Sequence, residues 1–340
     1  MNKWIGAAFA MSMVVACGPT ELPRSAAPEE EPVTWVIESS LSEPPIFIIA
    51  HRGASGERPE HTMEAYRLAI VQGADFIEPD LVMTKDGVLI ARHDRFLSTT
   101  TDVADRPEFA DRKKRKWVNG LPKDDWWAED FTLAEIKTLW ARQPRPARGT
   151  HYDDQFRIPT FAEVIALAKE AGVGIYPETK APSAHLEQGL DMEAALLAAL
   201  RKARWDGAGA PVYVQSFEPE ILQSLNEKIE LPLVQLLYGV PGLHGERPNI
   251  PLSDVTTYAD GVGVQKTLVV NKAGKATDFV SAAHGAGLFV HVWTVRDDEP
   301  APDGVPVEEE LERLYALGID GVFADYPATA VATRDAVLIP

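Results

Sequence analysis

Residues 76–93 read FIEPDLVMTKDGVLIARH. Two short runs rich in aliphatic residues, Phe76–Val82 and Val88–Arg92, lie on either side of a polar Thr-Lys-Asp-Gly segment. Asp-Gly between two apolar runs is a strong signal for a tight β-hairpin. The stretch therefore predicts two antiparallel strands joined at Asp86-Gly87, and the first of them carries two carboxylates separated by a proline.

From residue 46 onward, short apolar runs alternate with amphipathic helical patterns, as is typical of a parallel α/β fold. The expected strands are Ile46–Ala50, Phe76–Val82, Val88–Arg92, Val173–Glu178, Val212–Ser216, Leu233–Leu237, Gly261–Val264, Leu288–Trp293 and Gly321–Ala324. Because the third strand only returns from the second as a hairpin, eight parallel strands remain. The sequence therefore predicts a (β/α)8 TIM barrel, of the α/β class, as the catalytic domain over residues 46–340.

The helices between the strands have recognisable ends. Thr160 and Glu163 have the spacing of a capping box, and Gly172 is a natural stop, so a helix is expected between them. Residues 191–204 and 308–317 also predict helices.

The alternation of strands and helices breaks between residues 94 and 157. This stretch contains a basic run at 111–116 and a Pro/Arg-rich segment at 142–148, and Phe131–Trp140 predicts a helix that begins with capping-box spacing. We expect an insertion packed over the barrel mouth, with the basic run forming a solvated face.

Residues 1–17 have the composition of an export signal, since Lys3 is followed by an apolar run too short to span a bilayer. Val14-Val15-Ala16-Cys17-Gly18 resembles a bacterial lipobox, in which the cysteine is lipidated, and ordinary signal cleavage is the alternative. Residues 18–45 are rich in Pro and Glu, which predicts a flexible linker. The sequence thus predicts an exported, periplasmic protein, anchored to a bacterial membrane through Cys17.

The charge of the chain restricts its partners. Its 340 residues carry a formal net charge of −18, which argues against nucleic acid as the main partner and leaves the lipid anchor as the expected link to a membrane. A phosphate-bearing substrate would need positive charge concentrated locally, from Arg, Lys or a bound cation.

Three carboxylates follow or close predicted strands. Glu78 and Asp80 are two apart on one strand and therefore share a face, and Glu178 ends the strand that begins at Val173. The carboxyl ends of the strands of a (β/α)8 barrel meet at one mouth, where active sites lie. Oxygen-only ligands suit a hard cation such as Ca²⁺ or Mg²⁺, so the sequence predicts a metal site there.

Positive and titratable side chains are expected at the same mouth. Arg52 and Lys180 can hold a phosphate group, and His51 and His93 can divide acid and base work because imidazole titrates near neutral pH. A two-residue turn at the hairpin would place His93 opposite Asp80.

Short motifs spread over residues 46–335 carry a resemblance to a known family. They are His51-Arg52-Gly53-Ala54-Ser55-Gly56, Pro59-Glu60-His61-Thr62, Glu78-Pro79-Asp80-Leu81, Thr84-Lys85-Asp86-Gly87, His93-Asp94, Thr101-Asp102-Val103, Glu178-Thr179-Lys180, Gln215-Ser216-Phe217, Trp293-Thr294-Val295-Arg296 and Asp325-Tyr326-Pro327. Together they resemble the glycerophosphodiester phosphodiesterase family. The long insertion after His93, and His61 where many members have Asn, resemble its periplasmic branch.

The resemblance implies a metal-dependent hydrolysis of small-molecule glycerophosphodiesters (deacylated phospholipids) to sn-glycerol 3-phosphate and an alcohol. It implies the following roles: Glu78, Asp80 and Glu178 as ligands of one divalent cation, with Ca²⁺ as the first choice and Mg²⁺ as the second; His51 and His93 as the acid–base pair; Arg52 and Lys180 as phosphate ligands; and Gln215, Phe217 and Trp293 as the pocket lining. Which histidine is the base, and whether water or a glycerol hydroxyl attacks first, stay open.

Two other functions compete with this one. Phospholipases C and D on the same barrel also place two histidines beside an acidic metal site, but the motifs at 59–62 and 84–87 match glycerophosphodiesterases better. A non-catalytic, ligand-binding lipoprotein is the second alternative, and the intact set of polar site residues argues against it. Glu60 and Asp325 are expected near the site, in contact with it or only supporting it. The remaining histidines are expected to be structural, with a pocket position open for His291.

Overall fold

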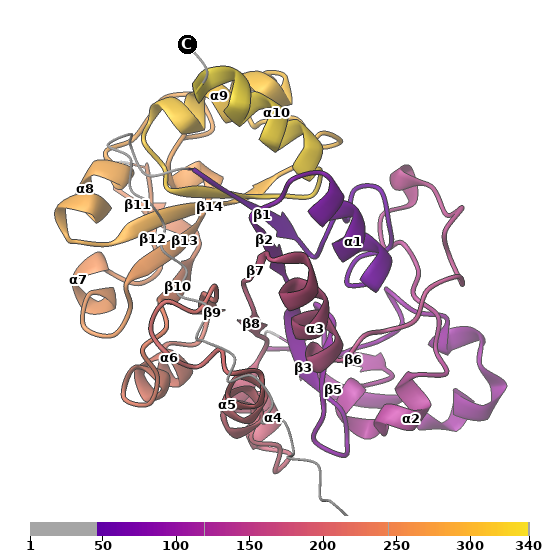
Figure 1. The fold of residues 1–340 in the computed structure, drawn as a ribbon. Coiled ribbons are helices and arrows are strands. Elements are labelled where there is room, and N and C mark those ends of the chain that lie inside the picture. Colours follow the sequence, from indigo (N-terminus) through magenta and orange to yellow (C-terminus); the bar gives the residue numbers. More distant parts are fainter. Residues whose placement is uncertain (1–45, 119, 244, 339–340) are drawn as a thin grey trace, which may run out of the picture. The chain divides into compact units, whose positions relative to one another are not determined.

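The computed structural model describes residues 46–118, 120–243 and 245–338. Within them the main sheet closes into a barrel (Figure 1). Its strands, in order round the barrel, are β1 (Phe47–His51), β2 (Phe76–Glu78) continued by β3 (Asp80–Met83), β7 (Gly174–Ile175) continued by β8 (Glu178–Thr179), β9 (Val214–Ser216), β10 (Leu233–Leu237), β13 (Gly261–Gln265), β14 (Phe289–Val295) and β15 (Gly321–Ala324). Each pairs in parallel with the next, and β15 returns to pair with β1. The predicted barrel of eight parallel strands is confirmed.

Two of the eight strands are interrupted at a proline. Pro79 separates β2 from β3, and Pro177 lies between β7 and β8. Proline has no N–H to donate to a neighbouring strand, so a ladder is broken at such a position. Pairing resumes beyond both prolines, where Asp80 lies opposite Glu178. The two interrupted strands therefore bring these carboxylates side by side.

The predicted hairpin is present, but its register differs from the prediction. β4 (Leu89–Ala91) runs antiparallel to β3, and the Arg92 N–H donates to the Asp80 carbonyl (2.9 Å), so Asp80 faces Arg92. The loop holds three residues, Lys85–Gly87, and Gly87 takes a left-handed φ of +77°. Such a loop has one residue more than a two-residue turn, which shifts the pairing by one position. The prediction that Asp80 lies opposite His93 is wrong.

Helices cover the outside of the barrel (Figure 1). They are α1 (Met63–Val71), α3 (Phe161–Ala171), α4 (Pro182–Leu186), α5 (Met192–Ala203), α6 (Pro219–Asn226), α7 (Leu252–Val255), α8 (Phe279–Gly285), α9 (Val307–Ala316) and α10 (Pro327–Leu338). The predicted start and stop of α3 are confirmed, since Thr160 and Glu163 form a capping box and Gly172 ends the helix at φ +71°. The two other predicted helices are α5 and α9.

The chain between β4 and α3 forms the inserted region. Its elements are η1 (Val103–Asp105), η2 (Pro107–Arg112), β5 (Lys114–Val118), β6 (Leu121–Asp125), η3 (Ala128–Asp130), α2 (Leu133–Ile136) and η4 (Pro146–Arg148). Its core includes Val82 and Ile90, whereas Leu81 and Ala91 of the same hairpin pack with residues of α3, so the insertion packs on the face of the β3–β4 hairpin opposite the helices. α2 is shorter than the predicted helix at 131–140, because the chain turns after Ile136 and Trp140 pairs with Arg157 in an isolated bridge instead of continuing the helix.

The basic run of the insertion begins at the end of η2 and continues onto β5, which pairs with β6 in a small antiparallel hairpin. Arg115 forms an exposed ion pair with Asp124 (2.6 Å), and Lys116 contacts Glu129 (2.9 Å). Neighbouring acids therefore neutralise much of the run. A second hairpin, β11 (Gly239–Gly242) and β12 (Gly245–Pro248), follows β10.

Aromatic side chains fill part of the barrel interior. They are Phe47, Phe76, Tyr176, Tyr213, Phe289 and Phe323. His291 of β14 lies among them, buried, with its Nδ1 2.8 Å from the Tyr176 hydroxyl. This packed layer supports the site from within the barrel.

Among the described residues, none of the helices combines the length and the apolar character needed to cross a bilayer. The predicted signal peptide, the lipidation site Cys17 and the linker lie outside the described residues.

Candidate active site

Three buried carboxylates meet at one end of the barrel. Glu78 ends β2, Asp80 begins β3 and Glu178 begins β8. One oxygen from each lies within 4.8 Å of the others, close enough for all three to bind a single ion. The strands that sequence reasoning chose as carriers of the site therefore bring these residues together.

Burial and neighbouring charges shift the pKa values of all three carboxylates. Burial, then the neighbouring Asp80 and Glu178, raises the pKa of Glu78 well above its usual range. Burial raises the pKa of Glu178 to about 8, although Lys180 opposes the shift. Burial also penalises the charge of Asp80, but Lys180 and the His61 hydrogen bond hold its pKa well below the usual range. Three negative charges so close together need further positive charge to coexist.

Two cationic side chains lie against this cluster. Lys180 Nζ is 2.8 Å from Glu178 Oε1, and Arg52 Nε is 3.2 Å from Asp80 Oδ2. Arg52 has a left-handed φ of +62°, and its own N–H donates to the Glu78 carboxylate (2.8 Å). Both side chains also line the pocket described below, where they can meet an anionic ligand.

His51 is held by an acidic partner. Its Nδ1 lies 2.6 Å from Asp325 Oδ1, at the end of β15. Burial, then Arg52, lowers the pKa of His51 to about 4, while Asp325 opposes the shift. Because the carboxylate accepts a hydrogen bond, Nδ1 carries the proton and Nε2 is left as the acceptor. The hydrogen bond to Asp325 therefore leaves Nε2 of His51 as the atom that can accept a proton.

His93 lies just beyond β4 in a more open position. About a third of its side chain is exposed (32%), and its Nδ1 is 3.0 Å from Asp94 Oδ1. Burial, then the charges of Arg52 and Lys180, lowers the pKa of His93.

One pocket joins these groups. It has a volume of about 130 Å³ and is lined by His51, Arg52, Glu78, His93, Glu178, Lys180, Gln215, Phe217, Leu236, Trp293, Thr294, Arg296 and Phe323. Asp80 is buried beside it and contacts the lining residues Arg52 and Lys180. Every predicted site residue in the described part of the chain therefore lies in or directly against this pocket. His291 does not line it.

The predicted pocket-lining residues form one wall. Phe217 and Trp293 stand edge to face, with ring centroids 5.9 Å apart. Gln215 Nε2 donates to Glu78 Oε1 (3.2 Å). The indole Nε1 of Trp293 is buried and has no hydrogen-bond partner among the described residues.

Several supporting residues were missed or left undecided by sequence reasoning. His61 links the Tyr66 hydroxyl to Asp80 Oδ2, at 2.8 and 2.9 Å, so it orients a carboxylate of the cluster. Glu60 binds Arg52 Nη1 (3.0 Å). His61 stood out in the sequence only as a difference from Asn, and the Asp80 contact gives that difference a physical role.

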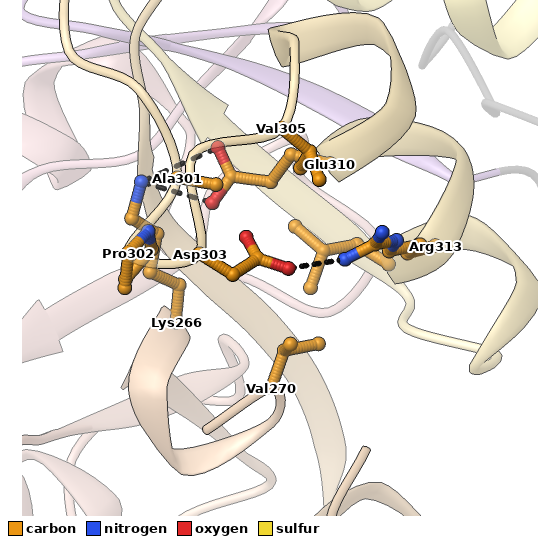
Figure 2. A pocket seen from close by; sticks show the side chains of 9 residues that line it. Lys266, Val270, Ala301, Pro302, Asp303, Val305, Glu310 and Arg313 are labelled. Carbon is orange, nitrogen blue, oxygen red and sulfur yellow. Dashed lines mark hydrogen bonds and ion pairs between the residues drawn. The ribbon is translucent and has the colours of Figure 1, made fainter. Parts of the chain in front are cut away.

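A second hollow lies apart from the barrel mouth, beside α9. Figure 2 shows that its charged side chains face one another. Lys266 Nζ is 2.9 Å from Glu310 Oε1, and Arg313 Nη1 is 2.5 Å from Asp303 Oδ2. The charges satisfy each other, which is typical of a structural ion-pair cluster.

A carboxylate-held histidine beside cations that can bind phosphate, at the mouth of a barrel, is an arrangement suited to the hydrolysis of phosphate esters. The comparison with known families makes this specific, since residues 51–329 match the sequence profile of the glycerophosphoryl diester phosphodiesterase family. The chain belongs to this family, as its motifs suggested, and it is a phosphodiesterase.

Relatives match along most of their length. A glycerophosphodiester phosphodiesterase, GDPD6, of Arabidopsis thaliana is 37% identical over 311 residues, which cover 82% of this chain and 83% of the relative. A glycerophosphodiester phosphodiesterase of Haemophilus influenzae is 33% identical over 331 residues, covering 84% and 88%.

Solved structures share the fold. A phosphodiesterase of Oleispira antarctica, in complex with the product sn-glycerol-3-phosphate, has a TM-score of 0.62 at 25% identity and covers 85% of this chain and 96% of its own. A glycerophosphodiester phosphodiesterase of Agrobacterium tumefaciens has a TM-score of 0.56 at 20% identity, covering 84% and 99%.

Proposed function

We propose that the protein hydrolyses glycerophosphodiesters to sn-glycerol 3-phosphate and an alcohol, using acid–base catalysis by His51 and His93 beside a divalent cation. The observation that carries the proposal is the pairing of His51 with Asp325 in a pocket shared with His93 and the carboxylate cluster. The product bound to the Oleispira antarctica relative supports glycerol 3-phosphate as the product here.

The carboxylate cluster fits a hard divalent cation. Asp80 Oδ1 is buried without a hydrogen-bond partner among the described residues, and the donor set is oxygen only. Glu78, Asp80 and Glu178 would hold the ion, with Ca²⁺ preferred and Mg²⁺ the second choice. When bound, it would supply positive charge that polarises a phosphoryl oxygen.

Arg52 and Lys180 hold the phosphate in this proposal. Both are charged, both line the pocket, and Lys180 also lies 5.8 Å from the Phe217 ring centroid, which places it between the polar and apolar walls. Their charges orient the phosphodiester with its ester oxygens toward the histidines.

The two histidines have different surroundings, and we assign their roles from them. His51 accepts the proton of the attacking hydroxyl at Nε2, because Asp325 fixes the proton on Nδ1. His93, more exposed, protonates the departing alkoxide from its imidazolium form, which the hydrogen bond to Asp94 favours against burial and the charges of Arg52 and Lys180. Attack by water and attack by a glycerol hydroxyl, which would give a cyclic phosphate first, both need the same base.

The apolar wall recognises the organic part of the substrate. Phe217 and Trp293 can pack against the glycerol carbons, and the free Trp293 N–H can donate to a glycerol hydroxyl. Gln215, held by Glu78, has a buried Oε1 with no partner among the described residues and can accept a second hydroxyl.

Export and lipid anchoring remain proposals based on residues 1–45. We propose periplasmic placement with lipidation at Cys17. Metabolic labelling with a radioactive fatty acid tests it, since a Cys17→Ala variant should lose the label, and an unlabelled wild-type protein would contradict lipidation.

The function is tested by a coupled assay for glycerol 3-phosphate release from several glycerophosphodiesters. His51→Ala and His93→Ala should each lower kcat by at least 10²-fold, the scale of a general acid or base. His284→Ala is a matched control, because His284 pairs with Asp320 outside the pocket. Full activity in both site variants would refute the mechanism. Turnover of intact phospholipid vesicles without turnover of glycerophosphocholine would favour a phospholipase.

A further inference from the structure

One arginine of the Pro/Arg-rich segment of the insertion binds Asp325, the carboxylate that holds His51. Arg148 ends η4, and its side chain is only 3% exposed. Its guanidinium binds Asp298 through two nitrogens, with Nε 2.7 Å from Oδ2 and Nη2 2.9 Å from Oδ1. Nη2 also donates to Asp325 Oδ2 (2.5 Å). A guanidinium fork held at several points is a rigid donor, unlike a flexible ammonium.

Asp325 connects this arginine to His51. Oδ1 of Asp325 lies against His51 Nδ1, and Oδ2 accepts from Arg148 and from Arg296 Nε (2.9 Å). A carboxylate bound at one oxygen alone can turn about its terminal bond. With Oδ2 fixed by donors, Oδ1 stays directed at the imidazole.

A second contact of Arg148 reaches the loop that follows His51. Arg148 Nη1 donates to the Ser55 carbonyl (3.1 Å), and the Ser55 hydroxyl donates to the His51 carbonyl (2.8 Å). Gln143 Nε2 of the same segment also donates to the Ser55 carbonyl (3.2 Å). The insertion therefore contacts both the side-chain partner and the backbone neighbour of this histidine.

We propose that Arg148 is a positioning residue, supplied by the insertion, that fixes Asp325 and thereby the orientation of His51. The inference rests on the proposed role of His51 in catalysis. Arg148 does not line the pocket, so it acts through other residues and not on the substrate. Residues that orient a first ligand or base typically change activity by about 10–100-fold when removed.

The competing interpretation is that Arg148 only fastens the insertion to the barrel through Asp298. The two differ in where the loss appears. A fastening residue lowers the melting temperature, and its effect on kcat does not depend on Asp325. A positioning residue lowers kcat with little change in KM, and its effect disappears once Asp325 can no longer hold His51.

The test is a double-mutant cycle on the full-length enzyme. Arg148→Met should lower kcat about 10-fold with KM within twofold, because Arg296 still holds Asp325. In an Asp325→Asn background the same substitution should cost less than about twofold. Arg145→Met is the matched control from the same segment. Arg145 forms an exposed ion pair with Glu299 (3.2 Å), and its loss should leave kcat unchanged.

Two further variants keep the test decisive if Arg148→Met folds poorly. Arg148→Lys keeps the charge but loses the fork, and should recover part of kcat at normal melting temperature. Asp298→Asn weakens the fastening contact and leaves the Asp325 contact, and should lower the melting temperature more than kcat. Equal losses from Arg148→Met in both backgrounds, or a full-activity Arg148→Met, would overturn the proposal. Full activity of His51→Ala would instead overturn the proposed function on which it rests.

Discussion

Replacing Asp325 by Asn should disable His51 without removing any side chain from the pocket. Oδ2 of Asp325 faces two donors, Arg148 and Arg296, which have no acceptor atoms to offer. The amide of Asn must turn its oxygen toward them, which leaves its NH2 group facing His51 Nδ1. Nδ1 must then accept, and the imidazole proton moves to Nε2, so the base is lost.

The magnitude follows from that change of tautomer. A general base contributes about 10²–10⁴-fold, and the same Asp-to-Asn change in the Ser-His-Asp triad costs about 10⁴-fold. We expect kcat to fall about 10³-fold, equivalent to about 4 kcal/mol of barrier. Initial rates of glycerol 3-phosphate release measure it. Asp297→Asn is the control, because Asp297 accepts from Thr329 outside the pocket. A loss under tenfold in Asp325→Asn would refute the reasoning.

Three further predictions concern the metal, its supporting histidine and the barrel interior. EDTA should abolish activity, and Ca²⁺ or Mg²⁺ should restore it. Calorimetry should detect Ca²⁺ binding to the wild-type protein but not to Glu178→Gln. Activity that persists in the chelator would reject the metal site. His61→Ala should weaken Ca²⁺ binding about 10–100-fold. His61→Asn keeps a hydrogen-bond donor toward Asp80 and should weaken binding much less. Equal Ca²⁺ affinity of the two variants would contradict the orienting role of His61. Burial holds the pKa of His291 at about 4 in the folded state against 6.5 when exposed, so the unfolded state binds the proton first and stability should fall by about 3 kcal/mol as the pH drops from 6.5 toward 4. Urea midpoints should fall less steeply across that range in His291→Gln than in the wild type, although not to a flat line, because burial also lowers the pKa values of His51, His61 and His185. His284→Ala should keep the wild-type slope, and a wild-type slope in His291→Gln would contradict the assignment.

Local features of the sequence predicted local structure well. The capping box at Thr160 and the stop at Gly172 are complete within a few residues, and both are present. The hairpin was predicted for the same reason, but its register depended on whether Gly87 was the second or the third residue of the loop. Asp-Gly is compatible with a two-residue and with a three-residue loop. The sequence alone therefore could not decide which residue pairs with Asp80.

The sequence predicted the site residues that lie at the ends of strands, but not the residues that support them. His51 and Glu178 could be assigned to one mouth because parallel strands of a barrel end together. Their supporting partners could not, since Arg148 and Asp325 are 177 positions apart in the chain and meet only when the insertion docks. Composition marked that segment as Pro/Arg-rich and irregular, which describes an exposed loop equally well. Burial of a charged side chain is a tertiary property, and it is the property that gives Arg148 its role.

The acidic character of the chain and the anionic substrate are compatible because charge is divided locally. The cluster of Glu78, Asp80 and Glu178 lies against two cations, Arg52 and Lys180, so its charge is only partly compensated. Burial raises the pKa values of Glu78 and Glu178, and the neighbouring carboxylates raise them further. A divalent ion bound there would add positive charge that the cluster lacks and would favour an anionic phosphodiester in the pocket. The net charge of −18 of the whole chain has little bearing on substrate binding at short range, since exposed charges beyond about 10 Å are largely screened by salt.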